Sequence, residues 1–308
     1  MVASLGIDLG GTFARAAVVG ARGELVASAK HTLTDRSPEA VVEAIGMASE
    51  RALALAPGVE VSGCGVGVAA QLDLVKNSVR VAPNIGWRDV PLGALLERRL
   101  KKRVVLINDL KAACYGEFVA GAGRGARDLL MASVGSGVGS AAIVNAQLVL
   151  GSHGVAGELG HIKVVAEGGR RCGCGEYGCL EAYAGGMNLI AQAKEAVSAG
   201  RSPKLAALSQ GEPSGPLPPQ IEEAAHAGDA AAREIYDRAV SYLSVAFANI
   251  VTVFNPARLI LGGGVMAHCP RMRKAIEDGV LRYTSMTSRV GFSVVDAQLG
   301  DDSGVVGA

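Results

Sequence analysis

Residues 157–181 read GELGHIKVVAEGGRRCGCGEYGCLE and contain three of the six cysteines of this 308-residue chain. Cys172, Cys174 and Cys179 are interleaved with glycine, and His161 stands upstream of them. Three thiolates and an imidazole are the ligand set of a closed tetrahedral zinc site, which contributes folding free energy directly. The alternative is a reduced, glycine-rich surface loop. The Cys-x-Cys-x4-Cys spacing with an upstream histidine favours zinc, although it differs from a Cys-x2-Cys pair.

Length, charge and composition limit the class of protein. A chain of 308 residues can form two domains around a cleft. The formal net charge is +1 and no basic run exceeds residues 101–103, which argues against a nucleic-acid partner. No apolar run has the length of a membrane span, and the start MVASLGIDLGGT lacks the charged and apolar regions of a signal peptide. With Cys64, Cys114 and Cys269 expected as buried free thiols, the prediction is a cytoplasmic protein without a membrane partner.

Two glycine-rich turns lie between predicted strands. Residues 2–8 and 13–19 are strands around the turn Asp8-Leu9-Gly10-Gly11-Thr12, and residues 129–134 and 141–145 are strands around GSGVGS at 135–140. Because a strand follows each turn, neither is a Walker loop or a dinucleotide site. Successive N–H groups in such a turn can still bind an anion, although the first turn alone could equally be an ordinary hairpin. The repeated pattern indicates a duplicated core with a cleft between the halves.

Two further strand ends are candidates for chemistry. Residues 103–107 form a predicted strand that ends in Asn108-Asp109 before a helix at about 111–120, the place where open α/β sheets put functional residues. Taken alone, Asp109 is better interpreted as the N-cap of that helix. Residues 258–261 form a strand that leads through three glycines into a helix near Val265, which is a suitable place for a nucleotide.

Together these motifs resemble the ROK family of sugar kinases, in particular its bacterial zinc-containing, ATP-dependent glucokinases. The motifs occur in the family's order along nearly the whole chain: DLGGT with Arg15, the Pro83-Asn84 loop, Asn108-Asp109, GSGVGS, GELGH, CGCGEYGCLE and LGGGV. The resemblance implies an α/β protein with the actin-like ATPase (ribonuclease H-like) fold, in which two α/β domains surround a central cleft. We expect a smaller domain at residues 1–115 and a larger one at 116–308 with the zinc site, and the extreme C-terminus to pack back on the first domain.

The resemblance also implies the reaction, which is transfer of the γ-phosphoryl group of Mg-ATP to the 6-hydroxyl of a hexose. Asp109 would be the catalytic base. The other sugar hydroxyls would be held by Asn84, Asn108, Glu158, His161 and Glu181. The ATP phosphates would lie on Gly10, Gly11, Thr12, Gly135, Ser136 and Gly137, with Gly262, Gly263 and Gly264 behind the adenosine.

Two metals follow from the same resemblance. Asp8 would hold Mg²⁺ through water, because this ion dehydrates reluctantly. Zinc would be structural, since protein fills all four positions, and it would orient His161 toward the sugar. Ser136 stands where the family more often has threonine, and it keeps the hydroxyl. A homodimer is expected from the family.

Several alternatives stay open at the level of sequence. Glucose is the first choice of substrate, while N-acetylmannosamine, N-acetylglucosamine, mannose, fructose and allose kinases share most of these motifs. Polyphosphate is a less favoured donor, because no basic run suits a polyanion. A sugar-sensing ROK regulator would carry a helix-turn-helix domain before the DLGGT motif, which here begins at Asp8. A non-catalytic, zinc-stabilised sugar-binding protein would have no reason to keep Asp109 and both phosphate turns.

Overall fold

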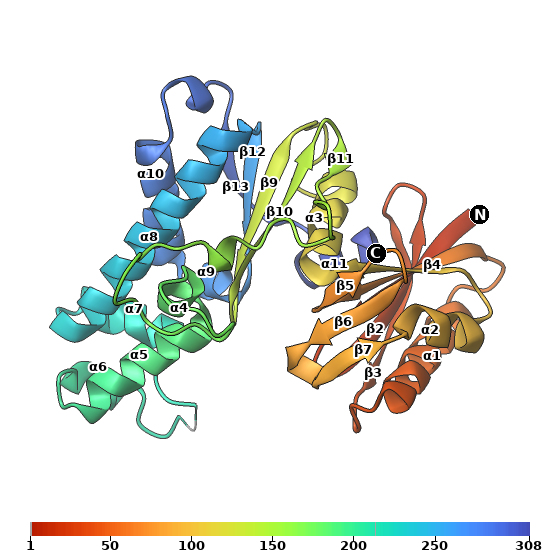
Figure 1. Ribbon diagram of the computed structural model, residues 1–308, viewed down its shortest axis with the longest axis horizontal. Helices are drawn as coiled ribbons and strands as arrows, with labels where there is room; N and C mark the ends of the chain where they lie inside the picture. The colour runs from red at the N-terminus through yellow and green to blue at the C-terminus, as the bar shows by residue number, and fades with distance from the viewer. Residues whose placement is uncertain (1, 213) are drawn as a thin grey trace. The chain divides into compact units, whose positions relative to one another are not determined.

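The computed structural model describes residues 2–212 and 214–308 and divides into two compact units (Figure 1). Unit 1 runs to Leu129 and adds Ala141–Gly157 and Ala297–Ala308. Unit 2 consists of Leu130–Ser140 and Glu158–Asp296. The bounds of these two units differ from those of the predicted domains, 1–115 and 116–308. The two domains remain a prediction. The C-terminal residues 297–308 therefore belong to the same compact unit as the first strands.

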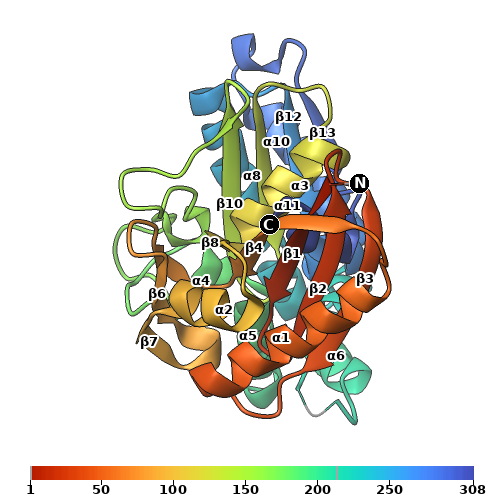
Figure 2. The same ribbon diagram turned by 90° about the vertical axis from the view of Figure 1, so that its right-hand side faces the viewer.

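A five-stranded sheet with the order β3-β2-β1-β4-β8 forms the centre of unit 1. In Figure 2 β1, β2 and β3 lie side by side, and the helix α1 (Pro38–Ala54) contacts all of them. The strand β1 is antiparallel to β2 and parallel to β4, and β4 is parallel to β8. The strands of this sheet are β1 (Val2–Leu9), β2 (Phe13–Gly20), β3 (Leu25–Thr32), β4 (Glu60–Val68) and β8 (Val104–Asn108).

Helices cover both faces of this sheet, and a small sheet adjoins it. The helix α1 contacts β1, β2 and β3, while α3 and α11 pack together and contact β4 from the other side of the sheet. The helices of unit 1 are α1 (Pro38–Ala54), α2 (Leu92–Leu100), α3 (Asp109–Ala120) and α11 (Ser303–Gly307), with the 3-10 turn η4 at Gly300–Asp302. The small sheet contains β5 (Gln71–Asp73), β6 (Ser78–Ala82) and β7 (Trp87–Val90), with the 3-10 turn η1 at Pro83–Ile85.

The side chains of β1 point alternately to the α1 face and to the α11 face of the sheet. Leu5, Ile7 and Leu9 are almost fully buried and share one hydrophobic core with Val41 and Ile45 of α1. The residues between them point to the opposite face, because successive side chains of a strand alternate. On that face Val305 of α11 packs against Ala17 and Val19 of β2.

Close backbone packing on the α11 face requires glycine. Gly6 and Gly65 are direct partners in the parallel pair of β1 and β4. A β-carbon at Gly6 would lie 1.8 Å from the carbonyl oxygen of Val305, and one at Gly65 would lie 1.6 Å from that of Ala308. A methyl group at either position would overlap backbone atoms, so the C-terminal helix can lie on this sheet only over glycine.

The buried carboxylate of Glu117 fixes the segment that leads into α11. This side chain of α3 is fully buried and accepts hydrogen bonds from the N–H of Leu299 at 2.8 Å and the N–H of Ala122 at 2.7 Å. A buried charged group is tolerated only when such donors satisfy it. Glu117 therefore ties the C-terminal segment to α3.

The second five-stranded sheet has the order β11-β10-β9-β12-β13. Its strands are β9 (Leu129–Val134), β10 (Val138–Val144), β11 (Gln147–Leu148), β12 (Arg258–Gly262) and β13 (Ser293–Asp296). The turn between β9 and β10 is the second glycine-rich turn, as the sequence predicts. The parallel pairing of β12 with β13 continues the sheet beyond β9.

The helices of unit 2 gather around α8. This 25-residue helix packs against α4, α5, α7 and α10, and Figure 1 shows α10 beside it. The Asp229 side chain caps its N-terminus by accepting a hydrogen bond from the N–H of Ala232, and Asn255 ends it in the left-handed conformation. The helices and 3-10 turns of unit 2 are η2 (Leu159–His161), α4 (Glu181–Ala184), α5 (Gly186–Ser198), α6 (Pro203–Leu208), α7 (Pro218–His226), α8 (Ala230–Phe254), α9 (Gly264–His268), α10 (Pro270–Tyr283) and η3 (Thr287–Arg289).

Among residues 2–212 and 214–308, no helix combines the length and the apolar composition needed to cross a bilayer.

Candidate functional site

Strand register brings two candidate carboxylates to one edge of the unit 1 sheet. Asp8 of β1 pairs with Gly67 of β4, and Val68 of β4 pairs with Asn108 of β8. Asp109 follows Asn108 as the first residue of α3. The three strands are parallel, so their carboxyl ends meet at this edge, as the α/β rule requires. Between the two carboxylates stands Gly67, which has no side chain to separate them.

The two carboxylates are close enough for the charge of Asp109 to act on Asp8. Burial, together with the negative charges of Asp109 and Asp301, raises the pKa of Asp8 to about 6, although Arg15 and Lys30 act in the opposite direction. A carboxyl group that is hard to ionise because of a neighbouring carboxylate gains strongly from a bound cation. The pair therefore suits the oxygen ligands that Mg²⁺ prefers.

The N-cap of α3 is Asn108, and the alternative that Asp109 caps this helix is wrong. The Oδ1 atom of Asn108 accepts a hydrogen bond of 3.2 Å from the N–H of Lys111. Asp109 lies in the first turn and is partly buried. The side chain of Asn108, and not that of Asp109, therefore caps the helix.

Arg15 links the first strands to the C-terminal segment. Its side chain is nearly buried and donates a 2.9 Å hydrogen bond to the carbonyl oxygen of Asp301 and a second hydrogen bond to the carboxylate of Asp302. The sequence motif contains Arg15, but no sequence signal connects it with residues almost 290 positions away. Asp301 and Asp302 were therefore missed as partners of Arg15, and Asp301 also as a negative charge near Asp8.

The first glycine turn and Asn84 complete the candidate residues of unit 1. In the turn, the N–H of Gly10 donates to the carbonyl oxygen of Phe13 at 3.1 Å, and the carbonyl oxygen of Thr12 accepts from the N–H of Leu33 at 2.8 Å. The side chain of Thr12 is exposed. Asn84 lies in η1 and is also exposed, and its backbone carbonyl oxygen accepts a 3.4 Å hydrogen bond from the side chain of Arg36.

In unit 2 the other two glycine turns are neighbours. Since β9 pairs with β12, the turns at their carboxyl ends lie side by side. A β-carbon at Gly135 would lie 3.9 Å from the nitrogen of Gly264, and one at Gly263 would lie 2.5 Å from the carbonyl oxygen of Val134. Gly263 has a φ of 91°, a conformation that favours glycine. The helix α9 that follows is only five residues long, which weakens the expected contribution of its N-terminus.

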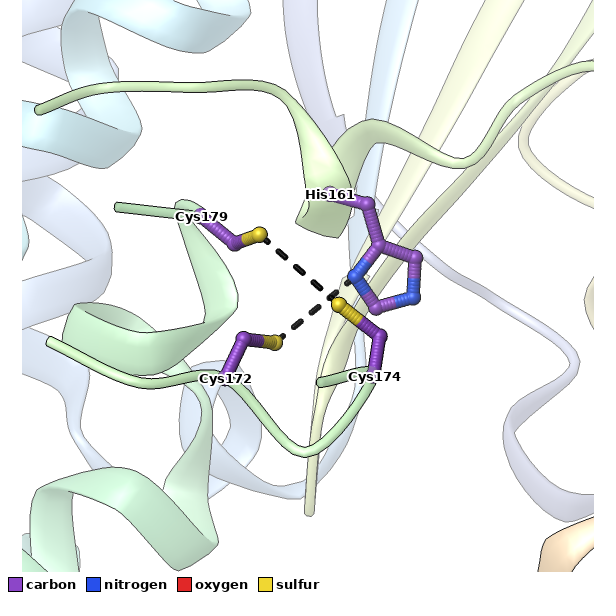
Figure 3. A group of neighbouring side chains, drawn as sticks. All are labelled: His161, Cys172, Cys174 and Cys179. Atoms are coloured by element: carbon purple, nitrogen blue, oxygen red, sulfur yellow. Dashed lines mark hydrogen bonds between the residues drawn. The ribbon is translucent and has the colours of Figure 1, made fainter. Parts of the chain in front are cut away.

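The cysteine–histidine cluster forms as the sequence predicts. Figure 3 shows the three sulfurs and the ring of His161 pointing toward one another. Their ligand atoms all lie within 4.8 Å of one another, with 3.8 Å between Cys172 Sγ and His161 Nδ1 and 3.9 Å between the sulfurs of Cys174 and Cys179. Zn–S bonds of about 2.3 Å in a tetrahedron separate two sulfurs by roughly 3.8 Å, so the cluster fits a zinc ion.

The thiols of the cluster differ in acidity. Burial raises the pKa of Cys172 to about 12. Burial also acts to raise the pKa of Cys174, but hydrogen bonds from the N–H of Glu176 and from the neighbouring cysteines lower it overall. Lys163 donates a 3.5 Å hydrogen bond to Cys179 Sγ. Because metals bind thiolates, a zinc ion at this cluster would release protons from these groups.

The two carboxylates that flank the cluster have different surroundings. Glu158 is exposed and precedes η2, which ends at His161. Glu181 is partly buried, and its Oε2 accepts a 2.9 Å hydrogen bond from the N–H of Val138 in the second glycine turn. Unit 2 therefore brings together Glu181, His161, the cysteines and two glycine turns, while unit 1 brings together Asp8, Asn108 and Asp109.

Comparison with known proteins identifies the family. The sequence pattern of the ROK family matches residues 4–308. The chain is 35% identical over 308 residues to a glucokinase of Streptomyces coelicolor, an alignment that covers 99% of this chain and 96% of that protein.

Two solved structures extend the similarity to the fold. A ROK family glucokinase from Streptomyces griseus, in complex with glucose and AMPPNP, has a TM-score of 0.80 and 34% identity over 99% of this chain and 97% of that one. A ROK hexokinase from Thermus thermophilus has a TM-score of 0.85 and 30% identity over 99% and 96% of the two chains. The actin-like ATPase fold predicted from the sequence is confirmed. The chain belongs to the ROK family.

Proposed function

We propose that this chain is an ATP-dependent hexose kinase that phosphorylates the 6-hydroxyl of glucose, with Asp109 as the base. The observation that supports it most is the likeness, over 99% of the chain, to a ROK glucokinase solved with glucose and an ATP analogue. The aligned carboxyl ends of β1, β4 and β8, with Asp8 and Asp109 beside each other, supply the groups that phosphoryl transfer needs.

Asp109 acts on the sugar hydroxyl in this proposal. Phosphoryl transfer passes through a loose transition state, so the carboxylate mainly orients the attacking oxygen and accepts its proton. Asp8 holds the magnesium ion of Mg-ATP through water. Mg²⁺ neutralises charge on the phosphates when it is bound. The high pKa of Asp8 fits this role, because a nearby cation favours its ionised form.

The remaining residues bind the two substrates. The glycine turns hold the phosphates with N–H groups, and the third turn supports the adenosine. The sugar hydroxyls take hydrogen bonds from Asn84, Asn108, Glu158, His161 and Glu181. Zinc bound by His161, Cys172, Cys174 and Cys179 fixes the orientation of the imidazole that faces the sugar. We also propose a homodimer in the cytoplasm, on the family resemblance alone.

A coupled assay of ADP release with a panel of hexoses tests this function. We expect glucose to give the highest kcat/KM and the product to be the 6-phosphate, with no turnover when the 6-hydroxyl is missing. The panel includes mannose, fructose, allose, N-acetylglucosamine and N-acetylmannosamine. A preference for one of these sugars would change the proposed substrate but not the proposed reaction. If no sugar raises ATP consumption above the sugar-free rate, the kinase proposal is wrong.

A further inference from the structure

The carboxylate of Glu181 touches both the metal cluster and the second glycine turn. Its Oε2 accepts the 2.9 Å hydrogen bond from the N–H of Val138, and its Oε1 lies 3.9 Å from Cys172 Sγ. The cluster residue Cys179 is two positions earlier in the chain. One side chain therefore spans the distance between a ligand of the cluster and the backbone of the turn.

The backbone that follows Glu181 holds the rest of the same turn. The N–H of Gly186 donates to the carbonyl oxygen of Gly135 at 2.9 Å, and the N–H of Met187 donates to that of Ser136 at 3.0 Å. These donors belong to the first residues of α5, directly after α4, which begins at Glu181. Residues 181–187 thus form hydrogen bonds with Gly135, Ser136 and Val138 of the turn, through one side chain and two N–H groups.

The cluster and the turn are closely packed at two glycines, Gly137 and Gly160. A β-carbon at Gly137 would lie 2.2 Å from Oε2 of Glu181, and Glu181 supplies all three of the atoms nearest to it. On the other side, a β-carbon at Gly160 would lie 2.1 Å from the carbonyl oxygen of Val138. Gly160 directly precedes His161 of the cluster. Both ends of the cluster are therefore packed against the turn.

We propose that Glu181 is a positioning residue for the nucleotide, through which the metal cluster fixes the turn Gly135–Val138. Metal binding and nucleotide binding are then coupled, because an ion that orders residues 161–181 also orders the N–H groups that face the phosphates. The coupling works in both directions, so nucleotide slows loss of the metal. This inference rests on the proposed nucleotide role of residues 135–137, and it adds a role for Glu181 that is independent of sugar.

Nucleotide affinity measured without sugar separates this role from sugar binding. We expect Glu181→Ala to raise the Kd of Mg-AMPPNP, measured by calorimetry, by roughly 5–50-fold, because the Val138 N–H loses its acceptor. Glu181→Gln keeps an oxygen that can accept this bond and should stay within about three-fold of the wild type. Glu176→Ala, which changes an exposed carboxylate of the same loop, is the control.

A double-mutant cycle tests the contact itself. Gly137→Ala puts a methyl group against the carboxylate, so we expect it to weaken AMPPNP binding in the wild-type background and to cost less when Glu181 is Ala. Equal costs in the two backgrounds, or unchanged AMPPNP affinity of a folded Glu181→Ala, would overturn the proposal. Loss of sugar affinity alone in Glu181→Ala would do the same and would leave the kinase function standing.

Zinc removal and zinc exchange supply readouts that need no sugar, and the first of them needs no variant either. Protein stripped of zinc by a chelator should bind AMPPNP several-fold more weakly, and zinc should restore the affinity. Zinc transfer to a chromogenic chelator should be slower with Mg-AMPPNP present, and Glu181→Ala should abolish that protection. If AMPPNP affinity is the same with and without zinc, the metal does not act on the turn and the inference fails, even when Glu181→Ala cannot be folded.

Discussion

The carbonyl oxygen of Val305 lies 1.8 Å from where a β-carbon on Gly6 would stand, so the C-terminal helix rests directly on the first strand. We expect Gly6→Ala to lower the free energy of unfolding by about 1–3 kcal/mol, the usual cost of overpacking against atoms that cannot move freely. Urea unfolding of the two proteins measures this difference.

Gly63→Ala is the matched control for Gly6→Ala. Gly63 lies in β4 of the same sheet, and its nearest atom, the carbonyl oxygen of Arg103, is 4.0 Å from the position of a β-carbon. This substitution should change stability by less than about 1 kcal/mol. Equal destabilisation by both substitutions would contradict the close packing of α11 on Gly6.

Replacing Asp109 by Asn should remove catalysis while sparing sugar binding. A positioned base contributes about 10²–10⁴-fold to a rate, so kcat for glucose should fall by that factor. The Kd of glucose, measured by calorimetry, should change by less than about five-fold, because an amide keeps most hydrogen bonds of the carboxylate. Asp278→Asn, at an exposed position of α10, serves as the control. A folded Asp109→Asn with wild-type kcat would show that another group is the base.

Asp8 gives a pH dependence of stability with a defined sign. Its pKa is raised from 3.8 to about 6, so the folded state binds the proton more tightly than the unfolded chain does. This contribution is fully present below about pH 4 and is lost as the pH rises through 6. Asp8→Asn, which mimics the protonated form, should therefore be more stable than the wild type by about 1–3 kcal/mol at pH 7.5.

Chemical unfolding of the wild type and of Asp8→Asn between pH 4 and 8, with a magnesium chelator present, measures the difference in their free energy of unfolding. This difference in stability should become smaller as the pH falls from 7.5 to 4, since the wild-type carboxyl becomes protonated. A gap that widens toward low pH, or a less stable variant at pH 7.5, would show that the pKa of Asp8 is not raised.

Substitutions in the metal cluster should affect zinc and sugar together. We expect Cys172→Ala or Cys174→Ala to lower the zinc content per chain and to raise the KM for glucose, because His161 loses the ion that orients it. Elemental analysis and steady-state kinetics measure the two effects. Cys64→Ala, a buried thiol of β4 outside the cluster, should leave the zinc content unchanged. Full activity of a zinc-free variant would exclude a role of the metal in sugar binding.

Local patterns predicted several elements closely. The strand β9 and the helix α8 have the bounds 129–134 and 230–254 that apolar periodicity and the terminal Asn255-Pro256 indicate. The cysteine cluster also follows from spacing alone, since its three thiols are within eight residues of one another. Short-range signals of this kind do not depend on the rest of the fold.

Elements without such signals were missed. The composition of residues 200–219, rich in Pro, Ser and Gly, predicts a surface loop, but the stretch contains α6 and the start of α7, with residue 213 outside the described residues. Proline is accepted in the first turn of a helix, so Pro203 starts α6 rather than preventing it. Contacts over long sequence separation were also beyond prediction. Glu117 with Leu299 and Arg15 with Asp302 depend on how the C-terminal segment returns to unit 1.

That return has a consequence for biosynthesis. Residues 297–308 emerge from the ribosome after all of unit 2, yet Gly6 and Gly65 need them as packing partners. During most of translation α11 is therefore absent from the first sheet, so the face of β1 that it contacts lacks this partner, while α3 can already pack on β4. The packing of unit 1 is therefore complete only once residues 297–308 have been synthesised.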